Sequence, residues 1–302
     1  MAHGTPASAE GIEPFYTKIR RGRPPSPEQL AELVSRYQAI GGTSPLAART
    51  RRQVEALAAH LESREPGRYL VRYGAKHTDP SIELAAADLG RAGVDQVVGI
   101  VLAPHESSLG SGEYLARAAA QLEAVPGGPA LVPVPKWYDV PGFAELVARR
   151  VRAALAGLRA RVSGRIPVVF SAHSLPVRTQ EQGDPYSSQV HQSAALVAAA
   201  AGLEDWQVAW QSAGRTPEPW IGPDILEVIR ELAAQGAAGV VSCPVGFVAD
   251  HLEVLYDLDV EARGVAEGVG LGFARTASLN DDPDLVAVLA GAVRAAAGAP
   301  RP

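Results

Sequence analysis

The chain has 302 residues, of which 47% are hydrophobic and 20% are charged, and its formal net charge is -5 at pH 7. A chain of this length and composition can bury the core of one large α/β unit or of two domains, and the acidic balance excludes the basic footprint of a nucleic-acid-binding protein. The single cysteine, Cys243, excludes an intramolecular disulfide bond and a cysteine-ligated iron–sulfur cluster.

Apolar strand-like runs alternate along the chain with stretches rich in alanine, leucine, glutamate and arginine. The predicted strands are residues 68–73, 96–103, 130–135, 166–172, 206–211, 239–243 and 271–274. The predicted helices are residues 27–40, 48–62, 81–91, 112–123, 142–159, 187–201, 223–235 and 283–297. This alternation is typical of a parallel α/β fold.

The hydropathy pattern predicts neither a signal peptide nor a membrane-spanning segment. No charged segment followed by an apolar one is found, and the longest run of small apolar residues, 194–202, is too short to cross a bilayer. We therefore expect a cytoplasmic protein.

The two halves of the chain share short blocks, which suggests an internal duplication. Met-Ala-His-Gly at residues 1–4 corresponds to Ser-Ala-His-Ser at 171–174, and Leu-Ala-Pro-His at 102–105 corresponds to Ser-Cys-Pro-Val at 242–245. The second half then has four predicted strands and the first half only three. Our hypothesis is that the first strand of the first half lies upstream of Met1 and runs into His3, because Gly4-Thr5-Pro6 is typical of a strand exit.

Five of the seven histidines follow strand-like runs: His3, His77, His105, His173 and His251. Parallel strands end at one edge of a sheet, where α/β proteins bind ligands, so we expect these imidazoles to line or rim one cleft. A single histidine in such a place more often only bonds a nearby loop. The shared placement of five favours a functional site, with His173 at its centre.

An acidic row follows His251. If the segment from residue 250 is α-helical, Glu253, Asp257 and Glu261 stand at i, i+4 and i+8 on one face. Such a row is usually a solvated face. It also suits a path for cations or protons out of the cleft, and imidazole with carboxylate suits a divalent metal such as ferrous iron.

Four blocks resemble the ferrochelatase family: Phe-Ser-Ala-His-Ser-Leu-Pro at 170–176, Trp-Gln-Ser-Ala-Gly-Arg-Thr-Pro-Glu-Pro-Trp-Ile-Gly-Pro at 210–223, Pro-Val-Gly-Phe-Val-Ala-Asp-His-Leu-Glu-Val-Leu-Tyr at 244–256 and Ile-Arg-Arg-Gly-Arg-Pro at 19–24. The resemblance is strongest to the short bacterial coproporphyrin III ferrochelatases of the class II chelatase superfamily.

The resemblance implies two similar Rossmann-like domains, each a parallel sheet flanked by helices, with a porphyrin cleft between them. We expect these domains at residues 1–147 and 148–302. His173 would be the metal-site histidine and Glu253 its carboxylate partner.

These residues suit metal insertion chemically. A porphyrin accepts a metal only when the ring is bent and two pyrrole protons leave. His173 can accept a proton or donate a lone pair near neutral pH, and Glu253 can relay protons or hold the cation weakly. The resemblance therefore implies insertion of ferrous iron into a porphyrin in heme biosynthesis, with coproporphyrin III favoured over protoporphyrin IX. Iron is then a substrate, and we expect no tightly bound cofactor.

Further residues are expected to grip the porphyrin. Arg20, Arg21 and Arg23 on a Gly/Pro-rich loop suit its carboxylates, although a solvated basic turn would look the same. Trp210 and Tyr16 offer flat faces or belong to the core.

Other substrate contacts, from Lys76, Ser107 and Tyr114, rest on the resemblance alone. The chain also departs from the family. His3 stands where tyrosine is usual, and as a better ferrous ligand it could contact the metal opposite His173, or it could mark an unusual lineage. Glu106 replaces a common aromatic residue and makes the predicted porphyrin wall more polar.

Alternative functions use the same cleft. A cobalt or nickel chelatase for sirohydrochlorin-type rings shares the fold, but the block at 210–223 favours the iron enzyme. A tetrapyrrole or metal carrier would bind without inserting. The glycines at 268–272 do not join a strand to a helix, which disfavours a dinucleotide enzyme. We expect a monomer that makes transient contacts with other enzymes of heme biosynthesis.

Overall fold

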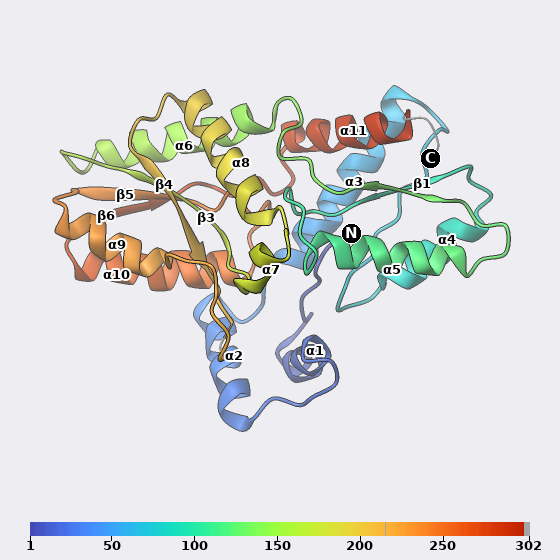
Figure 1. Ribbon diagram of the computed structural model, residues 1–302, viewed down its shortest axis with the longest axis horizontal. Helices are drawn as coiled ribbons and strands as arrows, with labels where there is room; N and C mark the ends of the chain where they lie inside the picture. Colours follow the sequence, from blue (N-terminus) through green and yellow to red (C-terminus); the bar gives the residue numbers. More distant parts are fainter. Residues whose placement is uncertain (215, 299–302) are drawn as a thin grey trace. The chain divides into compact units, whose positions relative to one another are not determined.

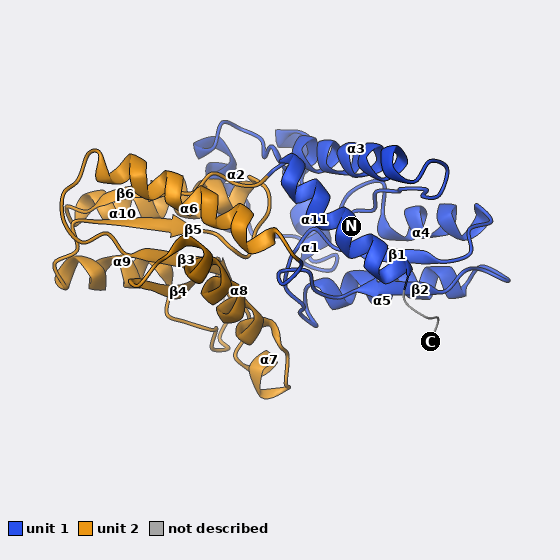
Figure 2. Ribbon diagram, turned by 90° about the horizontal axis from the view of Figure 1, so that it is seen from above, with its two compact units in different colours: residues 1–140, 280–302 blue, residues 141–279 orange. Residues whose placement is uncertain are grey.

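The computed structural model describes residues 1–214 and 216–298, and the chain forms two compact units. Unit 1 comprises Met1–Val140 and Asn280–Pro302, and unit 2 comprises Pro141–Leu279 (Figure 2). The boundary expected after residue 147 lies instead within a helix of unit 2. The C-terminal helix α11 (Pro283–Ala297) belongs to unit 1, because it packs against helix α3 and the strands there.

A four-stranded parallel sheet forms the centre of unit 2. Its strands lie in the order β4 (Trp206–Gln211), β3 (Val168–His173), β5 (Gly239–Cys243) and β6 (Gly272–Arg275). Helices α6 (Phe143–Arg159) and α8 (Tyr186–Ala201) cover one face, and α9 (Ile225–Ala234) and α10 (Arg263–Gly268) cover the other (Figure 1). A short helix, α7, spans Arg178–Glu181.

Burial on both faces explains why these strands read as unbroken apolar runs. Every residue of β5 is buried, as are all residues of β3 except His173 at its end. Val169 and Val240 pack with Ile229 of α9 in one core cluster. The rigid centre of the sheet therefore carries His173 to its carboxyl edge.

Unit 1 has a smaller parallel pair of strands, β1 (Val97–Ile100) and β2 (Leu131–Val134). Helices α3 (Leu46–Arg64) and α11 lie on one face of the pair, and α4 (Ile82–Arg91) and α5 (Ser111–Glu123) on the other (Figure 1). The unit begins with the 3-10 helix η1 (Ala9–Gly11), α1 (Ile12–Ile19) and α2 (Pro27–Ala39).

The predicted α/β class with parallel sheets flanked by helices is confirmed. Six predicted strands and all eight predicted helices agree with the structure to within a few residues. The strand predicted at 68–73 is wrong: this stretch is extended but joins no β-ladder in the part of the chain described. Unit 1 thus has two strands in its described residues, and not the three expected. A β-ladder requires a neighbouring strand. Next to this stretch, in the part of the chain that the structure describes, Ala75 forms only isolated β-bridges, one with Ala2 and one with Ser81.

The segment that follows β5 also differs from expectation. Val254–Ala262 form a π-helix, η2, which leads directly into α10. A π-helix closes i→i+5 hydrogen bonds, so the α-helical period assumed for the acidic row is wrong. Among the described residues, no helix combines the length and apolar character needed to cross a membrane.

Candidate active site

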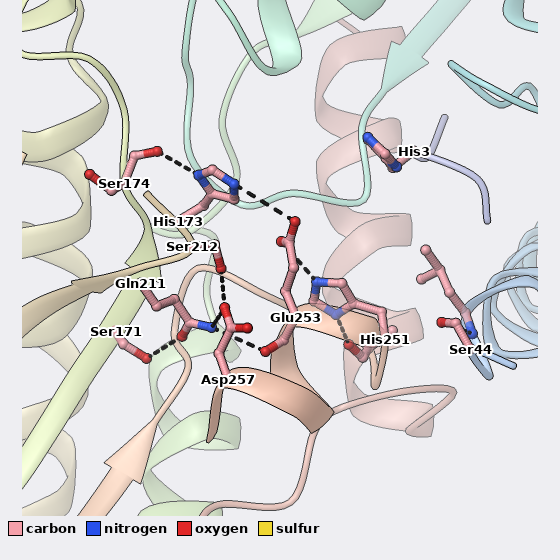
Figure 3. A network of polar contacts seen from close by, with 12 residues as sticks. His3, Ser44, Ser171, His173, Ser174, Gln211, Ser212, His251, Glu253 and Asp257 are labelled. Carbon is pink, nitrogen blue, oxygen red and sulfur yellow. Dashed lines mark hydrogen bonds and ion pairs between the residues drawn. The ribbon is translucent and has the colours of Figure 1, made fainter. Parts of the chain in front are cut away.

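The candidate site lies at the carboxyl edge of the sheet in unit 2. His173 ends β3, and Glu253 precedes the first residue of η2. The Nε2 atom of His173 is 3.8 Å from Oε1 of Glu253, and the two side chains are 34% and 38% exposed. Figure 3 shows Glu253 between His173 and His251. The pair predicted from the sequence therefore meets in space, in a position that a ligand can reach.

The orientation of the His173 ring is fixed by its neighbours. Its Nδ1 atom contacts the carbonyl oxygen of Ser174, so that Nδ1 is the donor and Nε2 carries the lone pair facing Glu253. The hydroxyl of Tyr186 donates to the backbone carbonyl of His173 at 3.1 Å. Burial, followed by the nearby Glu253 charge, raises the pKa of Tyr186, which keeps this donor protonated.

A second imidazole shares the carboxylate. Nε2 of His251 lies 3.5 Å from Oε2 of Glu253, while Nδ1 donates to the Ala249 carbonyl at 2.9 Å. Burial opposes protonation of His251, but the Glu253 carboxylate outweighs it and raises the pKa of His251 above its ordinary value. Glu253 thus has one imidazole at each oxygen.

Asp257 lies beneath Glu253 in a buried polar network. Its side chain accepts hydrogen bonds from the Ser212 hydroxyl and, at 3.4 Å, from the Gln211 amide, which also bonds the Glu253 carbonyl at 3.4 Å. Ser171 in turn donates to Gln211 at 2.9 Å. Asp257 is 5% exposed, so it is not part of a solvated face, whereas Glu261 is half-buried.

Gly246 allows the loop after β5 to approach β3 closely. Its N–H donates to the Ser171 carbonyl at 3.1 Å. A Cβ at this position would lie 2.6 Å from Cβ of Ala172, the residue before His173. The loop that leads to Glu253 is therefore packed directly on the strand that carries His173.

A half-buried arginine contacts the outer part of the same segment. Arg275 of β6 makes two hydrogen bonds to Asp259, at 2.9 and 2.8 Å, and an ion pair with Asp250 at 3.4 Å. Asp250 also accepts from Ser278 at 2.7 Å. Both ends of the segment that carries Glu253 are thus anchored to the sheet.

In unit 1 the structure brings His3 and His77 together. Their ring centroids are 4.7 Å apart, and Phe15 packs edge-on against both rings. Nδ1 of His3 donates to the Gly4 carbonyl at 3.1 Å, so Nε2 carries the lone pair. Burial and then the neighbouring His3, Lys76 and further cations lower the pKa of His77 to about 3, which keeps it neutral at pH 7.

The residues expected to grip substrate in unit 1 differ in accessibility. Lys76 pairs with Glu113 at 2.7 Å and lies over the Tyr114 ring. Tyr114 and Ser107 are buried, at 7% and 3% exposed. Ser107 accepts from the Gly110 N–H at 3.3 Å, near the start of α5.

The predicted arginine loop follows α1. Arg20 lies over the Tyr16 ring, with its guanidinium 5.5 Å from the centroid, and bonds the Arg23 carbonyl at 3.3 Å. Arg21 has φ 56°, which turns the chain sharply before Gly22. Arg21 and Arg23 are exposed.

Two predicted surface groups belong to the interior instead. His105 is 2% exposed and stacks on Tyr138 at 5.3 Å, so the expectation that it rims a cleft is wrong. Trp210 is 2% exposed and packs near Tyr186 and His191, which supports its alternative interpretation as a core residue.

Sequence reasoning missed Tyr186, Gln211, Ser212 and Gly246 as parts of the site. Gln211 could have been found from the sequence, because it ends the predicted strand 206–211 and lies opposite His173 in the parallel register of β3 and β4. Tyr186 lies 13 positions from His173 at the start of a helix, and no sequence pattern connects the two residues.

Comparisons with known proteins agree with this architecture. A family profile described as Ferrochelatase matches residues 1–297. The chain is 43% identical over 295 residues to the coproporphyrin III ferrochelatase of Bacillus subtilis (strain 168), covering 97% of this chain and 95% of the relative. It is 40% identical over 289 residues to the ferrochelatase of Herpetosiphon aurantiacus, with coverage of 96% and 95%.

Solved structures resemble the fold at low identity. SirB from Bacillus subtilis with Fe3+ superposes with a TM-score of 0.60 at 12% identity, covering 83% of this chain and 89% of that one. CbiX, described as the terminal enzyme of siroheme biosynthesis in denitrifying bacteria, gives 0.52 at 19%, with coverage of 83% and 93%. These two likenesses concern the fold alone.

Proposed function

The chain belongs to the ferrochelatase family, and from that premise we propose that it inserts ferrous iron into coproporphyrin III with His173 and Glu253 as the reacting side chains. It is an enzyme of heme biosynthesis that forms metal–nitrogen bonds in a porphyrin. The relatives named as coproporphyrin III ferrochelatases support the choice of porphyrin.

The observation that carries the proposal is the 3.8 Å approach of His173 Nε2 to Glu253 Oε1 at an accessible sheet edge. Insertion of Fe2+ displaces two pyrrole protons, so the site must accept protons one after the other. The Nε2 lone pair of His173 accepts a pyrrole proton, and the Glu253 carboxylate receives it in turn. His173 is then ready for the second proton.

Asp257 and Glu261 are proposed to continue the proton or metal path. The contacts of Asp257 with the Ser212 hydroxyl and the Gln211 amide support this role, because hydroxyl groups can pass protons along a chain of hydrogen bonds. Glu261, near the far end of η2, is more accessible than Asp257.

The same side chains can handle iron as a substrate. Imidazole and carboxylate are suitable ligands for ferrous iron, and no group of three or more His, Cys, Asp or Glu side chains in the described residues forms a ready-made metal cage. Such an open, weakly holding arrangement lets the metal move on to the porphyrin. We propose that no resident cofactor is needed. The sequence has only one cysteine, Cys243, which is buried.

His3 is proposed as a further iron ligand. Its Nδ1–H is held by the Gly4 carbonyl, which directs the Nε2 lone pair outward in the way that second-sphere bonds orient metal-bound histidines. A His3→Tyr variant tests this: we expect a changed absorbance spectrum of the enzyme-bound iron product and, after its oxidation to the ferric form, a changed electron paramagnetic resonance spectrum. Identical spectra would remove His3 from the ligand set.

Arg20, Arg21 and Lys76 are proposed to bind porphyrin carboxylates. The exposure of Arg21 and the position of Lys76 over Tyr114 support this assignment, whereas buried Ser107 and Tyr114 are proposed to act by shaping that surface. Coproporphyrin carries more carboxylates than protoporphyrin, so an Arg21→Ala substitution should raise KM more for coproporphyrin III.

The decisive experiment is anaerobic incubation with Fe2+ and either porphyrin, followed by metalloporphyrin absorbance. Glu253→Gln should lower kcat by about 10²-fold or more, since the relay loses its proton acceptor. Glu267→Gln, at an exposed position of α10, is the matched control and should behave like the parent. Undiminished insertion by Glu253→Gln, or parental activity of His173→Ala, would refute the mechanism. Insertion of cobalt or nickel into sirohydrochlorin alone would assign the enzyme to the other chelatase class.

The monomeric state, the cytoplasmic location and transient contacts with other enzymes of heme biosynthesis remain predictions. Analytical ultracentrifugation checks the first, and cell fractionation checks the second. Chemical cross-linking in cells tests the third.

A further inference from the structure

Arg275 lies at the end of β6 and binds the segment that carries Glu253. The side chain of Arg275 is only 12% exposed. Its Nε and Nη2 atoms donate to the two carboxylate oxygens of Asp259 in η2, at 2.9 and 2.8 Å. Two parallel hydrogen bonds from a guanidinium fix the orientation of a carboxylate as well as its distance. The sheet of unit 2 therefore holds this part of η2 in one position.

A second carboxylate binds the other side of the same guanidinium. Nη1 of Arg275 is 3.4 Å from Oδ1 of Asp250, and it donates to the Ser278 hydroxyl at 3.1 Å. The Ser278 hydroxyl in turn donates to Oδ1 of Asp250 at 2.7 Å. Asp250 is thus held by the arginine both directly and through a serine bridge.

The two carboxylates flank Glu253 in the sequence. Asp250 lies before Glu253, where the chain enters the helical segment, and Asp259 lies after it. Like charges that share a small space repel each other, and the guanidinium of Arg275 between the two carboxylates offsets this repulsion. Burial opposes the charged form of Arg275, but Asp259 and then Asp250 outweigh it and raise the pKa of the guanidinium above its ordinary value. Arg275 is therefore a permanent cation beside this segment.

The two contacts of the arginine are not equivalent. Asp259 has a second cation nearby, because Nη2 of Arg263 is 3.7 Å from its Oδ1 and Nε of Arg263 donates to its carbonyl at 3.2 Å. Asp250 instead adjoins His251, whose Nε2 lies 3.5 Å from Oε2 of Glu253. A shift of Asp250 would therefore move the turn that carries both His251 and Glu253.

We propose that Arg275 is a positioning residue for metal insertion: through Asp250 it holds the turn that places Glu253 opposite His173. The inference rests on the proposed roles of His173 and Glu253 in the reaction. Arg275 acts through Asp250 and not on the substrate. Misplacement of reacting groups by about 1 Å lowers a rate by up to about 10²-fold, so the effect should appear in kcat.

The test compares Ser278→Ala and Arg275→Gln in the full chain, by anaerobic insertion of Fe2+ into coproporphyrin III followed by metalloporphyrin absorbance. Ser278→Ala removes only the bridge to Asp250, so kcat should fall about 3-fold while KM and the melting temperature stay close to the parent. Arg275→Gln removes both contacts, and kcat should fall about 10-fold or more. Arg275→Lys, which keeps the charge without the parallel hydrogen bonds, should recover part of that loss.

Arg263→Gln is the matched control. It removes the second cation at Asp259 and leaves the contacts of Asp250 unchanged, so its kcat should equal that of the parent. An Asp250→Asn background tests whether Arg275 acts through this carboxylate. In that background Arg275→Gln should lower kcat by less than about 2-fold further, because residues that act through one contact are not additive.

Parental kcat in Ser278→Ala and Arg275→Gln, or a loss in Arg275→Gln that adds in full to that of Asp250→Asn, would overturn the inference. If Arg275→Gln does not fold, Ser278→Ala decides, because it removes one hydroxyl group only. The two proposals fail in different ways. Undiminished insertion by Glu253→Gln would refute the proposed function, whereas an impaired Glu253→Gln beside normal Arg275 and Ser278 variants would refute the positioning role alone.

Discussion

The close approach of Gly246 to β3 makes a sharp prediction about catalysis. In Gly246→Ala the new Cβ would lie 2.6 Å from Cβ and 2.9 Å from Cα of Ala172, whereas ordinary contacts are 3.4–4 Å. Loop and strand must therefore separate by roughly 1 Å, the difference between these distances. Ala172 precedes His173 in a strand paired on both sides, so the strain falls on the site.

The expected magnitudes follow from this geometry. Overpacking in a rigid core costs about 1–3 kcal/mol, which lowers the melting temperature by about 2–4 °C per kcal/mol for a chain of this size. A 1 Å misplacement of reacting groups costs up to about 10²-fold in rate. We therefore expect kcat for iron insertion to fall by about 10- to 100-fold, measured by metalloporphyrin absorbance at saturating porphyrin.

Gly264→Ala provides the control, because the added Cβ would meet nothing within 4 Å. Replacing a helical glycine by alanine should stabilise α10 by about 0.5–1 kcal/mol and leave kcat unchanged. Ala172→Gly in the Gly246→Ala background removes the closest contact and should restore part of the activity. If Gly246→Ala matches the parent in both kcat and melting temperature, the packing argument is refuted.

Three further predictions concern charge and protons. In Glu253→Gln the burial of His251 remains while the carboxylate is lost, so the His251 pKa should fall; an NMR titration that shows no fall would contradict the assigned coupling. Asp257→Asn should lower kcat by about 10-fold with the fold intact by circular dichroism, because the carboxylate that accepts from Ser212 is lost; full activity would remove Asp257 from the path. Burial lowers the pKa of His105 from 6.5 to about 3, so the unfolded state binds the proton first as the pH falls. The free energy of unfolding should therefore be lower at pH 5 than at pH 7 by about 2 kcal/mol. In urea unfolding, His105→Gln should make the free energy of unfolding depend less on pH, and an equal drop in the variant would refute the assignment to His105.

The strands of unit 2 were predictable because their signal is local. Residues 239–243 and 206–211 are apolar runs of strand length, and the structure begins and ends them at the predicted residues. The stretch at 68–73 has the same local character, yet it forms no ladder among the described residues. Pairing depends on a neighbouring strand, and no local pattern contains that information.

Two helices were harder to predict, each for its own reason. Helix α1 has only eight residues and carries Pro14 in its first turn, where proline is tolerated but usually marks a loop. The π-helix η2 follows a segment whose carboxylates fit an α-helical period well. Its wider turn instead accompanies the burial of Asp257 against Gln211 and Ser212, which are contacts from a distant strand. Tertiary bonds here override the local period.

The positions of His173 and Glu253 at one sheet edge were predictable from the order of strands and loops. The residues that contact this pair were not. His173 ends a buried strand and Glu253 follows the loop after another, so topology predicts both at one sheet edge, and the resemblance to the family implied that they are partners. The second imidazole at Glu253 is different. His251 was expected only to line the edge, but the structure places its Nε2 3.5 Å from Oε2 of the same carboxylate.

That shared carboxylate couples the protonation of Glu253 to the protonation of His251. The negative charge of Glu253 is what raises the pKa of His251 against its burial. If Glu253 accepts a proton in the proposed relay, this charge disappears and burial alone acts on His251, so the pKa of His251 is expected to fall. The protonation of Glu253 and that of His251 therefore oppose each other, and this coupling is what the NMR titration of Glu253→Gln measures.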